Sequence, residues 1–61
     1  MTDERIDAIT RRIAEIDARL AAGLGTDEYW ALFYERRELN SERSALETAR
    51  FLHLWAELRA A

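Results

Sequence analysis

The chain has no cysteine, no proline and no lysine, and its 61 residues include only two glycines and one histidine. Without cysteine it can form neither a disulfide nor a thiolate zinc site. A single histidine also excludes a histidine-rich metal site within one chain. A domain this small buries too little surface to be more than marginally stable alone, and disulfides, metals or oligomerisation usually compensate. The sequence therefore leaves association with another chain as the expected source of added stability.

Long apolar stretches are absent too. No run approaches the roughly 20 apolar residues that a membrane-spanning helix needs. Acidic residues come early, at Asp3 and Glu4, and no apolar segment typical of a secretory signal follows them. We therefore expect a cytoplasmic protein that does not enter the membrane.

The charge balance is mildly acidic. Twelve acidic and nine basic residues give a net charge of −3, whereas nucleic-acid binding is typical of strongly basic surfaces. We therefore do not expect nucleic acid to be the main partner. All the basic residues are arginine, which favours two-point contacts with carboxylate or phosphate groups.

The two glycines, Gly23 and Gly25, form the one break in the chain, and the segments on either side begin alike. Each opens with Thr-Asp-Glu, at Thr2 and again at Thr26. Threonine is a common N-cap, acidic residues stabilise the first helical turn, and glycine commonly ends a helix. We predict a single all-α domain over residues 1–61, an antiparallel helical hairpin with a short helix at about 3–22 and a long helix at about 27–59.

The first segment carries one narrow apolar stripe. Its aliphatic residues recur at spacings of three and four, at Ile6, Ile9, Ile13, Ile16 and Leu20. This spacing is typical of a helix that packs along another helix. Two acid–arginine pairs at four-residue spacing, Asp7–Arg11 and Glu15–Arg19, are expected to support the exposed side of that helix.

The second segment has a leucine line that we expect to receive this stripe. Leu32, Leu39 and Leu46 lie seven residues apart, and Ala45 and Ala49 lie on the same side. An antiparallel first helix is shorter, so it should cover the second only to about Leu46. The last turns of the long helix should then project beyond it.

A different side of the second segment, the outer face, is apolar at both ends and polar in the middle. Near the turn it carries an aromatic cluster, made of Tyr29, Trp30, Phe33 and Tyr34. Near the C-terminus it carries an apolar end, made of Phe51, Leu52, Leu54, Trp55 and Leu58. Between them lies a polar belt, made of Arg37, Asn40, Ser41, Ser44 and Thr48. Two hairpins that covered each other's projecting ends would form a four-helix bundle with this belt at its middle.

The polar belt has three interpretations. A buried polar layer can specify the register and oligomeric state of a bundle at a cost in stability. The belt could instead be exposed to solvent, or it could form a site for a ligand or partner. The direction of the two chains in such a bundle stays open.

No constellation of residues indicates catalysis. His53 has Glu57 four residues later, but a base without a nucleophile is not a mechanism. The sequence lacks the Glu-x-x-His pairs of di-iron bundles and any complete phosphate-binding loop. We therefore expect no enzyme activity, no catalytic residue, no metal site and no cofactor.

Two functional hypotheses follow. The first is a small homodimeric protein–protein interaction module, such as a regulator, an inhibitor or an assembly adaptor, that binds a protein partner still to be identified. Its interaction residues are Trp30, Phe33, Tyr34, Arg37, Phe51, Trp55 and Leu58. The alternative is a nucleic-acid or nucleotide binder that uses arginines of the second helix, namely Arg36, Arg37, Arg43 and Arg50.

Overall fold

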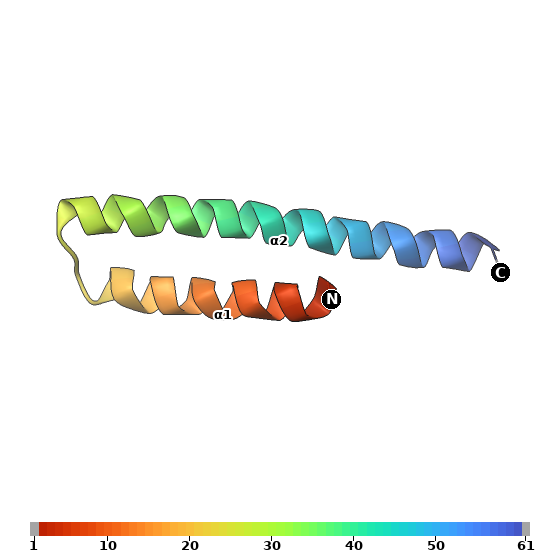
Figure 1. The fold of residues 1–61 in the computed structure, drawn as a ribbon, viewed down its shortest axis with the longest axis horizontal. Coiled ribbons are helices and arrows are strands. Elements are labelled where there is room, and N and C mark those ends of the chain that lie inside the picture. The colour runs from red at the N-terminus through yellow and green to blue at the C-terminus, as the bar shows by residue number, and fades with distance from the viewer. Residues whose placement is uncertain (1, 61) are drawn as a thin grey trace.

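The chain folds as two antiparallel helices, one much longer than the other (Figure 1). The computed structural model describes the backbone of residues 2–60 and the side chains of residues 3–60. Helix α1 spans Thr2–Ala21 and helix α2 spans Thr26–Ala60, and no strand occurs within this range. The all-α hairpin is therefore confirmed, and each helix boundary lies within one residue of its predicted position.

Helix α1 ends at a glycine in the left-handed region. Gly23 has a φ of 87°, and its N–H donates to the carbonyl of Leu20 at 3.4 Å. The N–H of Ala22 donates to the carbonyl of Ala18 at 3.1 Å, which completes the last turn. This is the usual glycine-ended helix terminus, and the half-buried Leu24 follows it. Gly23 thus ends α1 as its position in the sequence predicts.

The N-cap of helix α2 lies one residue before the predicted cap, Thr26. The N–H of Tyr29 donates to the carbonyl of Gly25 at 2.9 Å. Because the N-cap is the residue whose carbonyl accepts the first helical hydrogen bond, Gly25 is the cap and Thr26 is the first helical residue. Asp27 remains in the first turn, where its charge suits the helix dipole. The other predicted cap, Thr2, lies outside the described side chains.

The core is a narrow line between the helices. Its buried residues are Ile6, Ile9, Ile13, Ile16 and Leu32. The remaining predicted seam residues, Leu20, Leu39 and Leu46, are half-buried. Ala45 and Ala49 are exposed, so the face of α2 that meets α1 is narrower than predicted. The reason is that α2 contributes one leucine in seven residues, and a methyl side chain beside that line is too short to reach α1.

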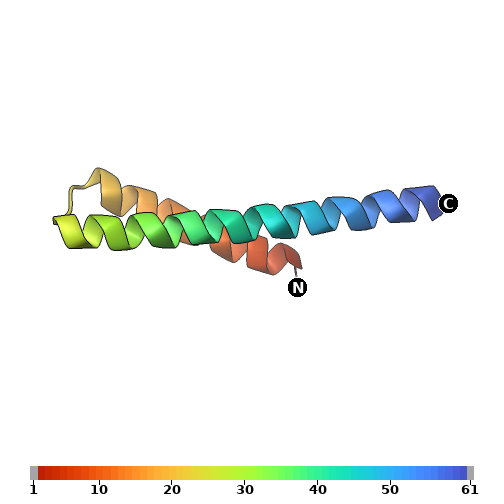
Figure 2. The same cartoon turned by 90° about the horizontal axis from the view of Figure 1, so that it is seen from above.

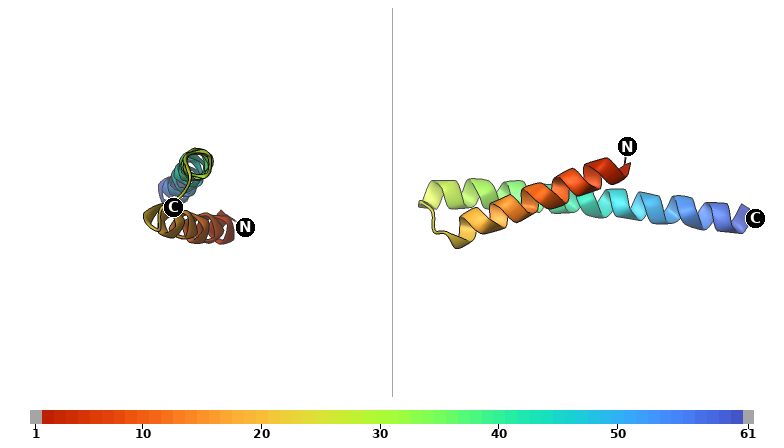
Figure 3. Two further views of the ribbon diagram at one scale, coloured as in Figure 1. Left: turned by 90° about the vertical axis from the view of Figure 1, so that its left-hand side faces the viewer. Right: turned by 90° about the horizontal axis from the view of Figure 1, so that it is seen from below.

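The molecule is elongated, and α1 crosses α2 obliquely (Figures 2 and 3). Its extents are 54 × 16 × 15 Å and its radius of gyration is 15.4 Å. A compact domain of this length has a radius of gyration of about 10.5 Å. The C-terminal turns of α2 extend beyond the N-terminus of α1 (Figure 1), and we call residues 51–60 the overhang. The predicted projection of the long helix is therefore present.

Candidate interaction face

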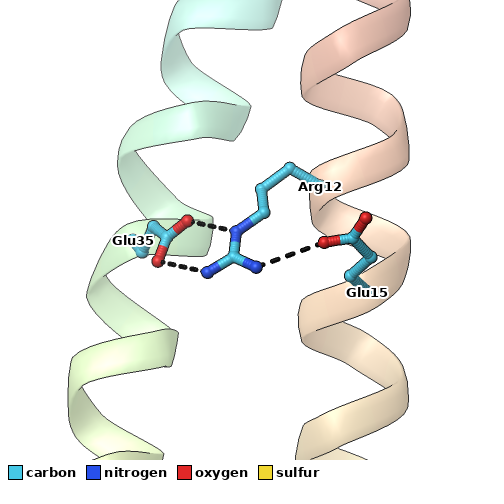
Figure 4. A network of polar contacts seen from close by, with 3 residues as sticks. All are labelled: Arg12, Glu15 and Glu35. Carbon is cyan, nitrogen blue, oxygen red and sulfur yellow. Dashed lines mark hydrogen bonds and ion pairs between the residues drawn. The ribbon is translucent and has the colours of Figure 1, made fainter.

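Two rows of polar contacts hold the helices in register, one on each side of the core. In the first row, Arg5 donates to both carboxylate oxygens of Glu42, with Nε–Oε2 2.6 Å and Nη2–Oε1 2.9 Å. Arg12 does the same to Glu35, at 2.6 Å and 3.0 Å, and also reaches Glu15 at 3.2 Å (Figure 4). A step of seven residues forward along α1 matches a step of seven backward along α2. Such two-point arginine–carboxylate contacts fix geometry as well as adding attraction.

The second row reverses the charges, with the acids on α1 and the arginines on α2. Arg50 donates to Asp3 with Nη1–Oδ1 2.7 Å, and Arg36 donates to Asp17 with Nε–Oδ1 2.7 Å. Between these pairs, at the same seven-residue step, α1 carries a threonine instead of an acid. The first helix therefore covers the second as far as Arg50, one turn further than predicted.

Most of the arginines predicted to bind nucleic acid form side-chain contacts within the hairpin instead. Arg43 donates to Asn40 at 2.9 Å and to Thr10 at 3.3 Å, and the neighbouring arginines of the row pair with acids. Arg37 is exposed, and the side chains of residues 3–60 give it no ion-pair partner. Arg37 lies on the outer face, whereas the other three predicted arginines lie in the second row beside α1. The structure therefore does not gather all four on one surface.

The two ion pairs predicted within α1 are not formed. Over the described side chains, neither Asp7–Arg11 nor Glu15–Arg19 forms. Glu15 instead meets Arg12, three residues before it, at 3.2 Å. Sequence reasoning missed the two rows, although opposite charges repeated every seven residues beside an apolar seam are their usual signal.

The ion pairs of the first row shift the pKa values of their side chains. The hydrogen bond from Arg12, reinforced by its charge, holds the pKa of the Glu35 carboxyl below its ordinary value. The hydrogen bond from Arg5 lowers the pKa of Glu42 in the same way. The glutamates in turn raise the pKa of Arg5 and of Arg12. Both glutamates are therefore held in the charged form that their pairs require.

The predicted interaction residues are all exposed on α2. The large apolar side chains among them range from 39% exposed at Phe33 to 69% at Leu58. Within the aromatic cluster, the rings of Trp30 and Phe33 meet edge to face with centroids 5.5 Å apart. Within the apolar end, Phe51 stacks on Trp55 with centroids 6.3 Å apart and planes at 9°. Each group is thus a preformed aromatic surface that faces solvent in the single chain.

The two groups lie mainly on the side of α2 that is turned away from α1. Phe33 and Phe51 are 18 residues apart, about five complete helical turns, so they point in nearly the same direction. The buried Leu32, one residue before Phe33, points about 100° away from it around the helix, toward α1. All five residues of the polar belt are exposed between the two groups. The chain therefore carries one continuous outer face with an apolar, polar and apolar order.

The expected histidine–glutamate pair is formed, on the overhang. His53 Nε2 lies 3.1 Å from Glu57 Oε1, and both side chains are exposed. No third acid, histidine or cysteine joins them as a possible metal ligand anywhere in the described part of the chain. The described residues also enclose no pocket.

Across residues 2–60, neither helix combines the length and the apolar character that crossing a bilayer requires. Comparisons of the chain with protein-family models, with curated proteins and with solved structures each gave no match.

Proposed function

We propose that this chain is a non-enzymatic protein–protein interaction module, a regulator, inhibitor or assembly adaptor that works as a homodimeric helical bundle. One observation carries the proposal, namely that every large exposed apolar side chain among the described residues lies on α2. These are Tyr29, Trp30, Phe33, Tyr34, Phe51, Leu52, Leu54, Trp55 and Leu58. Large apolar patches exposed on a small protein typically mark an interaction surface.

The exposed area of the single hairpin supports association. The hairpin exposes 4930 Å², whereas a compact monomer of 7.1 kDa exposes about 4,100 Å². The excess, about 800 Å², is close to what one partner buries in a protein interface of standard size. A second chain on the outer face would bring the exposed area of each hairpin to that of an ordinary folded domain.

Arg37 gives the outer face a polar anchor. It stands between the two apolar groups and is exposed. Arginine and aromatic residues are enriched among the side chains that dominate binding energy in interfaces. Trp30, Trp55 and Arg37 are therefore the residues whose truncation should weaken binding most.

The test is sedimentation equilibrium of the purified chain and of matched serine variants at micromolar concentration. We expect the wild type to sediment as a dimer and Trp55→Ser to weaken the dimer at least about tenfold, because the substitution removes an indole ring that the interface would bury. Ala14→Ser, at an exposed position of α1, should leave the dimer unchanged. A wild type that stays monomeric while melting cooperatively contradicts the proposal.

The arginine-based alternative, binding of nucleic acid or a nucleotide, has less support. Three of its four arginines already donate to side chains of the hairpin, and the net charge is −3. Filter binding at low salt distinguishes the two proposals, since phosphate contacts are strongest there. We expect no retention of RNA or DNA, and retention that Arg37→Ala abolishes would favour the alternative.

A further inference from the structure

We infer that the occupant of the outer face is a second copy of this chain. The two α2 helices pack antiparallel about a twofold axis that lies between them, at the level midway between Glu42 and Arg43. The inference rests on the proposed function and specifies its geometry. The sequence left the chain direction open, and the exposed pattern of α2 now selects one direction and one register.

Two pairs of large aromatic residues on the outer face are placed symmetrically about the level between positions 42 and 43. Trp30 and Trp55 are equidistant from it along the helix, and so are Tyr34 and Phe51. Antiparallel pairing therefore places the aromatic cluster of each copy against the apolar end of the other. All four side chains are between 48% and 62% exposed in the single hairpin, so each has surface left to bury.

Charge selects the direction, because a parallel arrangement would also match apolar groups with apolar groups. Parallel pairing would set Arg37 of one copy beside Arg37 of the other, whereas antiparallel pairing sets it beside Thr48. Ser41 then meets Ser44 across the axis, and these short hydroxyl side chains let the two helices approach closely. Like charges placed together across an interface are costly, so the polar belt disfavours the parallel dimer.

The charges at the two ends of α2 also favour antiparallel pairing. Its first turn carries Asp27 and Glu28, and its last turn carries Arg59. Antiparallel pairing brings the basic last turn of one copy level with the acidic first turn of the other and opposes the two helix dipoles. Parallel pairing would bring acid to acid at one end and arginine to arginine at the other.

The exposed overhang is a third feature that favours antiparallel pairing. Beyond Arg50, α1 makes no ion pair with α2 in the described part of the chain, and every residue of the overhang is exposed. In the antiparallel register, each overhang lies beside the turn end of the other hairpin, where two helices are present. In a parallel dimer, the two overhangs would meet only each other, which would bury less of Leu54 and Leu58.

A charge-complementation experiment tests the direction. Trp30→Glu and Trp55→Arg are made in separate chains, and each variant alone should be monomeric at a concentration where the wild type is dimeric. When they are mixed, antiparallel pairing leaves one end with its two native tryptophans and joins glutamate to arginine at the other. Sedimentation velocity with a fluorescent label on one variant should then show a heterodimer.

The matched control replaces Trp55→Arg by Trp55→Glu and mixes it with the same Trp30→Glu chain. This mixture brings two glutamates together, so its heterodimer should be at least about tenfold weaker. In a parallel dimer the two substituted positions never meet, and equal affinities in the two mixtures would overturn the inference. Two monomeric mixtures beside a dimeric wild type would also overturn it and would leave the proposed function standing, whereas a monomeric wild type would contradict both. Circular dichroism of each variant checks that the helices persist.

Discussion

At the scale of single residues, the hairpin depends on a few enclosed isoleucines and on arginines that reach across to the other helix. Among the described side chains, Ile9 and Ile16 are almost fully buried, at 1% and 0% exposure. The side chains beside them are charged, and they pair between helices at a fixed seven-residue step. The isoleucines supply the burial, and the charged rows determine which residues of α2 lie opposite each turn of α1.

One position in the second row lacks its acid. Thr10 stands where the step from Asp3 to Asp17 places a carboxylate, and Arg43 reaches it at 3.3 Å. We predict that Thr10→Asp stabilises the hairpin by about 0.2–1 kcal/mol, as exposed ion pairs do. Urea unfolding followed by circular dichroism measures the gain. Thr10→Asn should give none, and a gain that persists unchanged at 1 M salt would contradict an ionic origin.

The first row predicts how stability depends on pH. Because folding lowers the pKa of Glu35 and Glu42 below the ordinary value of 4.5, their contribution is complete above that value. It is lost as the pH falls through the lower folded-state pKa. We expect the melting temperature to decrease on acidification below about pH 4.5. The double variant Glu35→Gln, Glu42→Gln should start lower at neutral pH and show a flatter acid limb, and an unchanged acid limb would contradict the assignment.

At the scale of elements, the two glycines of the turn, Gly23 and Gly25, have different structural roles. Gly23 ends α1 with a φ of 87°, whereas Gly25 caps α2 without a positive φ. A side chain would meet no neighbour at either position. The difference between them is therefore conformational and can be measured with the same substitution at both places.

We predict opposite signs for serine at the two glycines. Gly23→Ser should destabilise the hairpin by about 1–2 kcal/mol, because a side chain in the left-handed region is strained. Gly25→Ser should stabilise it by about a few tenths of a kcal/mol, since serine is the better N-cap. Thermal melts of the two variants give the comparison. A loss at Gly25 equal to that at Gly23 would show that the turn needs two flexible residues.

The helices could be predicted because their signals are local. Gly23, the acidic first turns and the spacing of the isoleucines each act within a few residues, and the predicted boundaries were correct to one residue. The cap was placed at Thr26 instead of Gly25 because both residues are acceptable N-caps, and only the backbone hydrogen bond distinguishes them. The charged rows were missed because they depend on how the helices align. Arg36 illustrates this, since its role follows only once Asp17 is known to lie opposite.

At the scale of the whole molecule, the unequal helices leave a surface that one chain cannot cover. The predicted interaction residues are exposed where the sequence placed them, from Trp30 at the turn end to Leu58 on the overhang. The sequence could predict that they share a side of α2, because helical periodicity fixes that. It could not predict a direction of pairing, which depends on how Arg37 and the charged ends of α2 oppose a second copy.

The most direct test of the antiparallel dimer is the distance between nitroxide labels on its two copies, measured by double electron–electron resonance. The chain has no native cysteine, so Ala45→Cys and Ala56→Cys can each carry one label, and both positions are exposed and lie off the outer face. In the antiparallel register, the two labels at position 56 should lie about 40 Å apart and those at position 45 below about 20 Å. Equal short distances at both positions, a shorter distance at position 56 than at position 45, or no dipolar coupling at all would contradict the antiparallel dimer.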